Sequence, residues 1–120
     1  MSSPIKNVPA TLVVNPGTGE VFKFSVPALG RKFDVEGGPW SSGTPATYDG
    51  VLYYIGSDDL EGLQTAAVSV DASSKVAVSF IDGWSLTGNP PAIANFVSNK
   101  TAASAIVQNA EDNRGTWSRV

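Results

Sequence analysis

Three carboxylates are the residues of this chain whose types and spacing could support catalysis. Asp58, Asp59 and Glu61 follow an apolar run. One of them, together with Asp49 or Asp82, could act as the acid and base pair of a small hydrolase. The segment lacks the alternating oxygen ligands and central glycine of a calcium-binding EF-hand loop, so we expect no metal site. The interpretation that we favour is that these carboxylates keep a surface loop in water.

The other common catalytic groups are missing from the sequence. The chain contains no histidine and no cysteine, which removes the usual general base, the thiolate nucleophile and the usual zinc ligands. No nucleophile-elbow spacing of glycine and serine occurs. The glycines at 37, 38 and 43 lack the lysine of a phosphate-binding loop. We therefore expect no cofactor, no catalytic residues and a function other than catalysis.

Aromatic side chains are better candidates for a functional role. Trp40 lies in a Gly- and Pro-rich segment, residues 36–49, and Tyr48 lies near its end. A tryptophan or tyrosine on a loop can stack on a sugar ring or anchor a partner protein. Trp84 and Trp117 occur near turns, and for these two we favour packing in the core or at an edge over a binding role. The predicted ligand-binding residues are Trp40, Tyr48, Trp84, Asp58 and Asp59.

Two neighbouring tyrosines occupy one predicted strand. Residues 51–55 are apolar on both faces, which indicates a central strand. Because successive side chains of a strand point to opposite faces, at most one of Tyr53 and Tyr54 is expected to be exposed.

The elements that must position these residues are predicted mainly as strands. Residues 11–14 and 20–26 flank a cluster of turn-forming residues, and residues 64–70 and 75–81 alternate apolar and polar side chains on either side of a short turn. Both pairs predict β-hairpins. Residues 31–35 show the same alternation.

The C-terminal third fits two patterns. The apolar residues after Asn89 recur at three- and four-residue steps, which is typical of an amphipathic helix. We predict a short helix or turn near residues 91–99. Residues 105–107, a turn at 112–115 and residues 116–120 then predict a last hairpin, preceded earlier in the chain by a short strand at 84–86.

The strand pattern predicts one all-β domain, mainly antiparallel, that spans residues 1–120. A chain of 120 residues leaves no room for a second folded unit. About 7–9 short strands separated by frequent turn signals are typical of a β-sandwich or a small barrel.

Composition limits the partners and the location. The net charge is −3 and no basic block occurs, which argues against nucleic acid. No apolar run approaches the length that crosses a bilayer, so no membrane insertion is expected. The start Met1-Ser2-Ser3 does not lead into an apolar run, so we expect a leaderless cytoplasmic protein, with release from the cell as the alternative.

The start Met1-Ser2-Ser3, the opening hairpin of residues 11–26 and the aromatic-bearing loops resemble small, leaderless, cysteine-free β-proteins of fungal fruiting bodies. These include lectins, immunomodulatory proteins and taste-active (sweet) proteins. The resemblance implies a β-sandwich that forms homodimers and binds glycans or cell-surface proteins. Viral surface-decorating proteins share the same composition.

The leading prediction is a non-catalytic, lectin-like binding protein that recognises a carbohydrate or a protein through Trp40 and Tyr48. A structural or self-assembling protein, whose exposed strand edges pair between chains, is the second. A taste-active or immunomodulatory protein and a small carboxylate hydrolase are the remaining alternatives.

Overall fold

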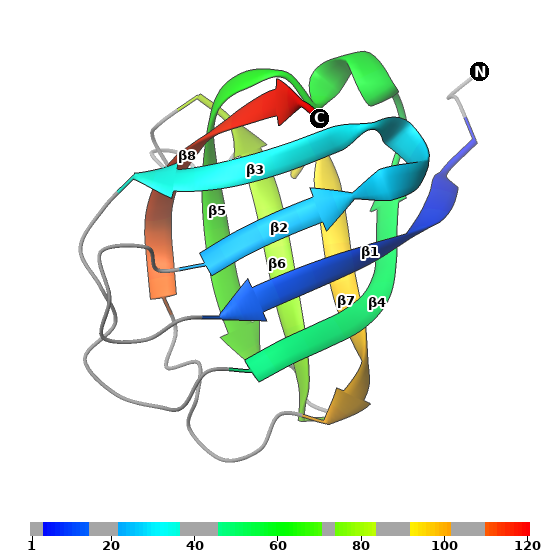
Figure 1. Ribbon diagram of the computed structural model, residues 1–120, viewed down its shortest axis with the longest axis vertical. Coiled ribbons are helices and arrows are strands. Elements are labelled where there is room, and N and C mark those ends of the chain that lie inside the picture. Colours follow the sequence, from blue (N-terminus) through cyan, green and yellow to red (C-terminus); the bar gives the residue numbers. More distant parts are fainter. Residues whose placement is uncertain (1–3, 15–21, 37–45, 71–73, 84–91, 102–109) are drawn as a thin grey trace.

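The computed structural model describes residues 4–14, 22–36, 46–70, 74–83, 92–101 and 110–120. In these ranges the regular structure consists of strands and two short 3₁₀ helices (Figure 1). The strands are β1 (Lys6–Val14), β2 (Phe22–Val26), β3 (Arg31–Glu36), β4 (Ala46–Tyr54), β5 (Gly62–Val70), β6 (Lys75–Asp82), β7 (Ala94–Thr101) and β8 (Ala110–Arg119). The 3₁₀ helices are η1 (Pro27–Leu29) and η2 (Ser57–Asp59).

The eight strands form one closed barrel. Their order around the barrel is β1-β2-β3-β8-β5-β6-β7-β4, and β4 pairs again with β1. Neighbouring strands are antiparallel throughout (Figure 1). The predicted all-β, antiparallel fold is therefore confirmed. Of the two predicted architectures the chain adopts the small barrel, because the sheet closes on itself instead of forming a sandwich.

The barrel consists of two Greek keys. β1, β2 and β3 lie side by side, and β4 returns to lie beside β1; this order defines a Greek key. β5, β6, β7 and β8 repeat the same order. The pairs β3·β8 and β4·β7 join the two keys, so the barrel is closed by pairing between residues far apart in the sequence.

The first two of the three predicted hairpins are present. β1 pairs with β2, with Leu12 opposite Phe24, and β5 pairs with β6, with Val68 opposite Val78. Burial alternates along β2, where the phenylalanines and Val26 point inward. Two-residue alternation thus separates the core face of these strands from the outer face.

Aromatic rings fill the interior of the barrel. The ring centroid of Phe24 lies 5.0 Å from those of Phe80 and Phe96, and the ring of Trp117 lies 5.0 Å from Phe80 and 5.2 Å from Phe33. Trp117, for which packing in the core or at an edge is expected, belongs to the core, since it is 3% exposed. The interior of an eight-stranded barrel is narrow enough for side chains to fill it, and here these packed rings occupy the described part of it. The outside and the ends of the barrel are therefore the places to look for a binding site.

Two glycines give these rings room at matching positions of the two keys. Gly50 of β4 pairs with Ser98 of β7, and a Cβ atom added to Gly50 would lie 2.8 Å from the ring of Phe96. Gly115 of β8 pairs with β3 in the same way, and its Cβ would lie 2.6 Å from the ring of Phe33. A glycine in a strand often marks such a close approach.

The predicted short helix near residues 91–99 is wrong. This region forms β7, in which Ala94, Phe96 and Ser98 are buried while the intervening side chains are more exposed. Apolar residues spaced by two, three and four positions satisfy both periodicities over a short run. Pairing with β4 on one side and β6 on the other stabilises the strand.

The predicted last hairpin is also corrected. Residues 112–115, predicted as its turn, lie inside β8, which pairs with β3 and β5. Residues 105–107 and 84–86, which were predicted as strands, lie outside the described residues.

The long predicted loop at residues 36–49 is shorter than expected. β3 extends to Glu36 and β4 begins at Ala46, and residues 37–45 lie outside the described residues. Tyr48 therefore belongs to a strand and not to a loop.

The first described residues and the C-terminus lie at one end of the barrel. The first residues of β1, the end of β4 and η2 lie at the top of Figure 1, and the C-terminus is drawn beside them. The backbone N–H of Val120 donates a hydrogen bond of 2.9 Å to the carbonyl oxygen of Gly30. This contact holds the last residue close to the turn between η1 and β3.

Candidate functional site

The predicted aromatic site is not brought together in the described structure. Trp40 and Trp84 lie outside the described residues. Tyr48 pairs with Leu12 of β1 and is only 2% exposed. The ammonium group of Lys100 lies 5.3 Å from the centre of its ring. The interpretation of Tyr48 as a solvent-facing loop aromatic is therefore wrong, because β4 begins before it and directs its ring inward.

Asp58 and Asp59 form part of η2 and are both exposed. Glu61, the third carboxylate of the cluster, is engaged by two guanidinium groups. Its Oε1 lies 2.9 Å from Nη2 of Arg31 and 3.5 Å from Nη2 of Arg119. Because Arg31 is only 7% exposed, Glu61 balances a buried charge.

Of the other carboxylates of the hydrolase alternative, Asp49 lies away from η2. Asp82 lies at the same end of the barrel as η2, because the N–H of Gly83 bonds the carbonyl oxygen of Leu63 at the start of β5. Asp49 accepts a hydrogen bond of 2.9 Å from the hydroxyl of Thr11, in the half of β4 opposite to η2. Asp82 is exposed at the end of β6. Among the residues that the structure describes, no group of three or more acidic side chains is arranged to hold a metal ion.

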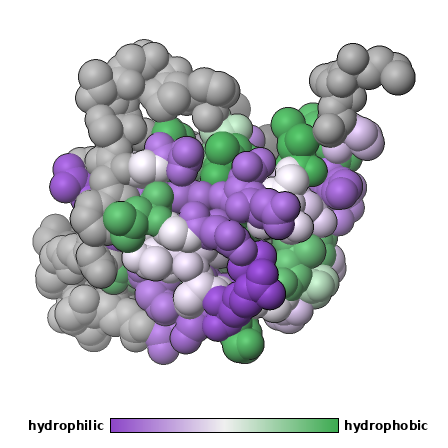
Figure 2. All heavy atoms as spheres, turned by 90° about the horizontal axis from the view of Figure 1, so that it is seen from above, coloured by the Kyte–Doolittle hydropathy of each residue, from purple (hydrophilic) through white to green (hydrophobic). Residues whose placement is uncertain are grey.

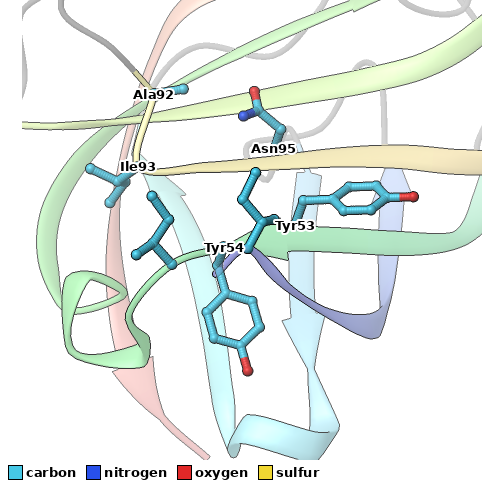
Figure 3. Close-up of a pocket in the computed structure, with 7 residues that line it drawn as sticks. Tyr53, Tyr54, Ala92, Ile93 and Asn95 are labelled. Atoms are coloured by element: carbon cyan, nitrogen blue, oxygen red, sulfur yellow. The ribbon is translucent and has the colours of Figure 1, made fainter. Parts of the chain in front are cut away.

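Tyr53 and Tyr54 behave as the sequence predicts. Tyr53 is 42% exposed, whereas Tyr54 is 9% exposed and belongs to the core. Figure 3 shows their side chains leaving β4 in different directions. Tyr53 is thus an exposed aromatic on the outer face of the barrel.

A shallow pocket lies beside Tyr53, where β1, β4 and β7 meet (Figure 3). Its volume is about 150 Å³. It is lined by Ile5, Tyr53, Tyr54, Ile55, Ala92, Ile93 and Asn95. Most of these side chains are aliphatic or aromatic, so the pocket is suited to an apolar group.

Large apolar side chains remain exposed around this pocket. Ile5 is 68% exposed and Ile55 is 48% exposed. Viewed from above, this end of the molecule shows apolar groups in green next to hydrophilic groups in purple (Figure 2). Single exposed apolar side chains are ordinary, whereas a group of them around a pocket is a candidate for a binding site. We call Ile5, Tyr53, Ile55, Ile93 and Asn95 the Tyr53 site.

The turn after Ile55 is held firmly by the core. The buried amide of Gln64 donates hydrogen bonds to the carbonyl oxygens of Asp59 and Glu61. Its Oε1 accepts a 2.6 Å hydrogen bond from the indole N–H of Trp117. Leu60, just after η2, is fully buried. These contacts therefore fix the position of the turn that carries Ile55 and the two aspartates of η2.

Asn95 is the polar member of the Tyr53 site. Its Oδ1 accepts a hydrogen bond of 3.0 Å from the hydroxyl of Ser79, which leaves the amide N–H₂ group to donate outward. Asn7, Tyr53, Asn95 and Ser79 lie opposite one another on β1, β4, β7 and β6. They form an uncharged row across the outer face of the barrel.

This arrangement can bind, but its side chains offer no nucleophile with an adjacent base. Sequence reasoning missed Ile5, Ile55, Ile93 and Asn95. The exposed Tyr53 could be predicted from alternation, whereas its neighbours come from three strands whose pairing is not visible in the sequence.

Comparisons of the chain with protein-family models, with curated proteins and with solved structures returned no match. Among the described residues, no helix combines the length and apolar character needed to cross a bilayer.

Proposed function

We propose that this protein is a non-catalytic recognition module that binds a partner protein by seating an apolar side chain of that partner at the Tyr53 site. The observation that carries this proposal is the pocket of about 150 Å³ with Ile5, Tyr53 and Ile55 exposed around it. Aromatic and aliphatic pockets of this kind receive the anchor residues that dominate the energy of protein interfaces.

The geometry supports an anchor more than a broad interface. Burial of one Leu- or Phe-sized side chain contributes about 1.5–3 kcal/mol. The exposed amide of Asn95 lies at the pocket and can bond a backbone carbonyl of the partner. Since Gln64 and Trp117 hold the η2 turn in place, binding requires little ordering of this wall.

The first prediction uses peptides selected from a displayed random library against the whole protein. Tyr53→Ala and Ile55→Ala should each weaken binding of the selected peptides by about tenfold or more, because each removes apolar area from the pocket. Leu63→Ala is the matched control: Leu63 is 51% exposed on β5 but does not line the pocket. Its affinity should stay within about twofold of wild type.

Calorimetric titration of each variant gives the affinities. Equal affinity of all three variants would show that the selected peptides bind elsewhere, and failure to select any peptide would also count against the proposal.

A carbohydrate ligand is the second candidate, favoured by the uncharged row of Asn7, Tyr53, Asn95 and Ser79. Aromatic faces and amide groups on a flat sheet can bind the C–H face and hydroxyl groups of a sugar. A glycan array probed with the same variants and with Asn95→Ala separates the candidates. A glycan ligand should depend on Tyr53 and Asn95 and tolerate Ile55→Ala, whereas a peptide anchor should depend on Ile55.

The self-assembly alternative gains little from the structure. In a closed barrel most strand edges are already paired. Residues 6–10 of β1 pair with β4 alone, but this stretch contains Lys6 and Pro9, and both residue types disfavour pairing between sheet edges.

A further inference from the structure

Two carboxylates stand next to the apolar wall of the Tyr53 site. Asp58 and Asp59 are separated from Ile55 by only Gly56 and Ser57. Oδ2 of Asp59 lies 3.3 Å from the position that a Cβ atom of Gly56 would occupy. The carboxylate of Asp59 therefore lies against the backbone immediately after Ile55.

These two carboxylates differ from Glu61 in their partners. Glu61 is engaged by Arg31 and Arg119. Within the described part of the chain, neither Asp58 nor Asp59 forms an ion pair, and both are exposed. Their negative charge is available to a group that binds beside Ile55.

We infer, on the basis of the proposed function, that the partner's apolar anchor is accompanied by a lysine or arginine that contacts Asp58 and Asp59. The favoured partner is thus a basic, apolar protein segment. The charge of Lys6 determines on which side of the pocket the basic residue of the partner should lie. Lys6 follows Ile5 and pairs in register with Tyr54, so it disfavours a cation on the β1 side and leaves η2 as the side for the basic residue.

The contribution of Asp58 and Asp59 to affinity should be small, because both carboxylates are exposed. Charge pairs at the surface change affinity by about fivefold or less each, and salt screens them. Two carboxylates should therefore give about a tenfold preference for a basic over an acidic peptide at low ionic strength. This preference is a difference in binding free energy between two peptides. The apolar anchor still supplies most of the affinity for either peptide.

The test uses the whole protein and synthetic peptides of equal length with one central phenylalanine, flanked by lysine, serine or glutamate and blocked at both ends. Binding is measured by calorimetry at about 0.05 M and about 0.5 M salt. The variant is Asp58→Asn with Asp59→Asn. Its matched control is Asp34→Asn with Asp49→Asn, which changes the net charge equally at exposed positions on β3 and β4.

At low salt the lysine-flanked peptide should bind about tenfold more tightly than the glutamate-flanked one. The difference should shrink at high salt, disappear in the Asp58/Asp59 variant and persist in the control. Tyr53-dependent binding without any preference for flanking charge would overturn this inference and leave the proposed function intact. A preference that persists in the Asp58/Asp59 variant would place the acidic contact elsewhere. No binding by any of the peptides would overturn both.

Discussion

Single polar residues determine how firmly the Tyr53 site is held. Gln64 is fully buried, yet its amide bonds both the indole of Trp117 and the backbone of the η2 turn. A buried polar group is costly when its partner is removed. This one side chain therefore links the aromatic core to the surface turn that carries Asp58 and Asp59.

Replacement of Gln64 by methionine should lower the free energy of unfolding by about 2 kcal/mol or more, because the indole N–H of Trp117 and two carbonyl oxygens lose their partner while the volume is kept. Urea unfolding followed by circular dichroism measures the change. Ser79→Ala removes an exposed hydrogen bond to Asn95 and should cost about 0.5 kcal/mol or less. Equal losses in the two variants would contradict this role of Gln64.

At this scale, sequence predicted that at most one of Tyr53 and Tyr54 is exposed and favoured packing for Trp117, because strand alternation and residue size are local properties. It failed for Tyr48, because the Gly- and Pro-rich residues before it gave no sign that β4 begins at Ala46. The roles of Gln64 and Asn95 depend on neighbours from distant strands and could not be predicted.

The position of each strand depends on its contacts with neighbouring strands as much as on its own residues. β4 and β8 each contain one glycine beneath a phenylalanine of the neighbouring strand. The ring occupies the space that a side chain would need, so these glycines let neighbouring strands approach closely around the core.

We expect Gly115→Ala to destabilise the protein by about 1–3 kcal/mol, because the new Cβ would lie 2.5 Å from the backbone oxygen of Asp34, which cannot easily move. Gly56→Ala is the control. There the nearest atom is the flexible carboxylate of Asp59, 3.3 Å away, so the change should stay within about 0.5 kcal/mol. Thermal and urea unfolding of both variants give the comparison, and a tolerated Gly115→Ala would show that the backbone can shift.

The two hairpins were predictable because alternation and turn residues occur together within each of them. β7 was misread as a helix because its apolar spacing also fits three- and four-residue steps. The turn predicted inside β8 was wrong because the strand continues through it: Gly115 pairs with both Val35 and Gln64, and Asn113 pairs with Ala66.

At the scale of the whole molecule, the two Greek keys share one core. Phe24 and Phe33 from the first key contact Phe80, Phe96 and Trp117 from the second. The closure pairs β3·β8 and β4·β7 are remote in sequence. For this reason a small barrel could be predicted as one of two architectures, while closure itself could not.

We expect the barrel to unfold as a single cooperative unit, since neither key can keep its aromatic rings buried without the other. In urea, far-ultraviolet circular dichroism follows the strands and near-ultraviolet circular dichroism follows the packed rings. The two transitions should coincide. Separate midpoints would indicate that one Greek key is stable alone.

The position of Ile5 governs how binding should be measured. Ile5 lines the pocket and lies four residues from the start of the sequence. An affinity tag or sensor surface joined ahead of Ile5 would crowd the approach of a ligand. Thr47 is the second residue of β4. It is exposed and lies at the end of that strand opposite to Tyr53. Because the chain has no cysteine, Thr47→Cys would supply a unique thiol for attachment that presents the pocket outward.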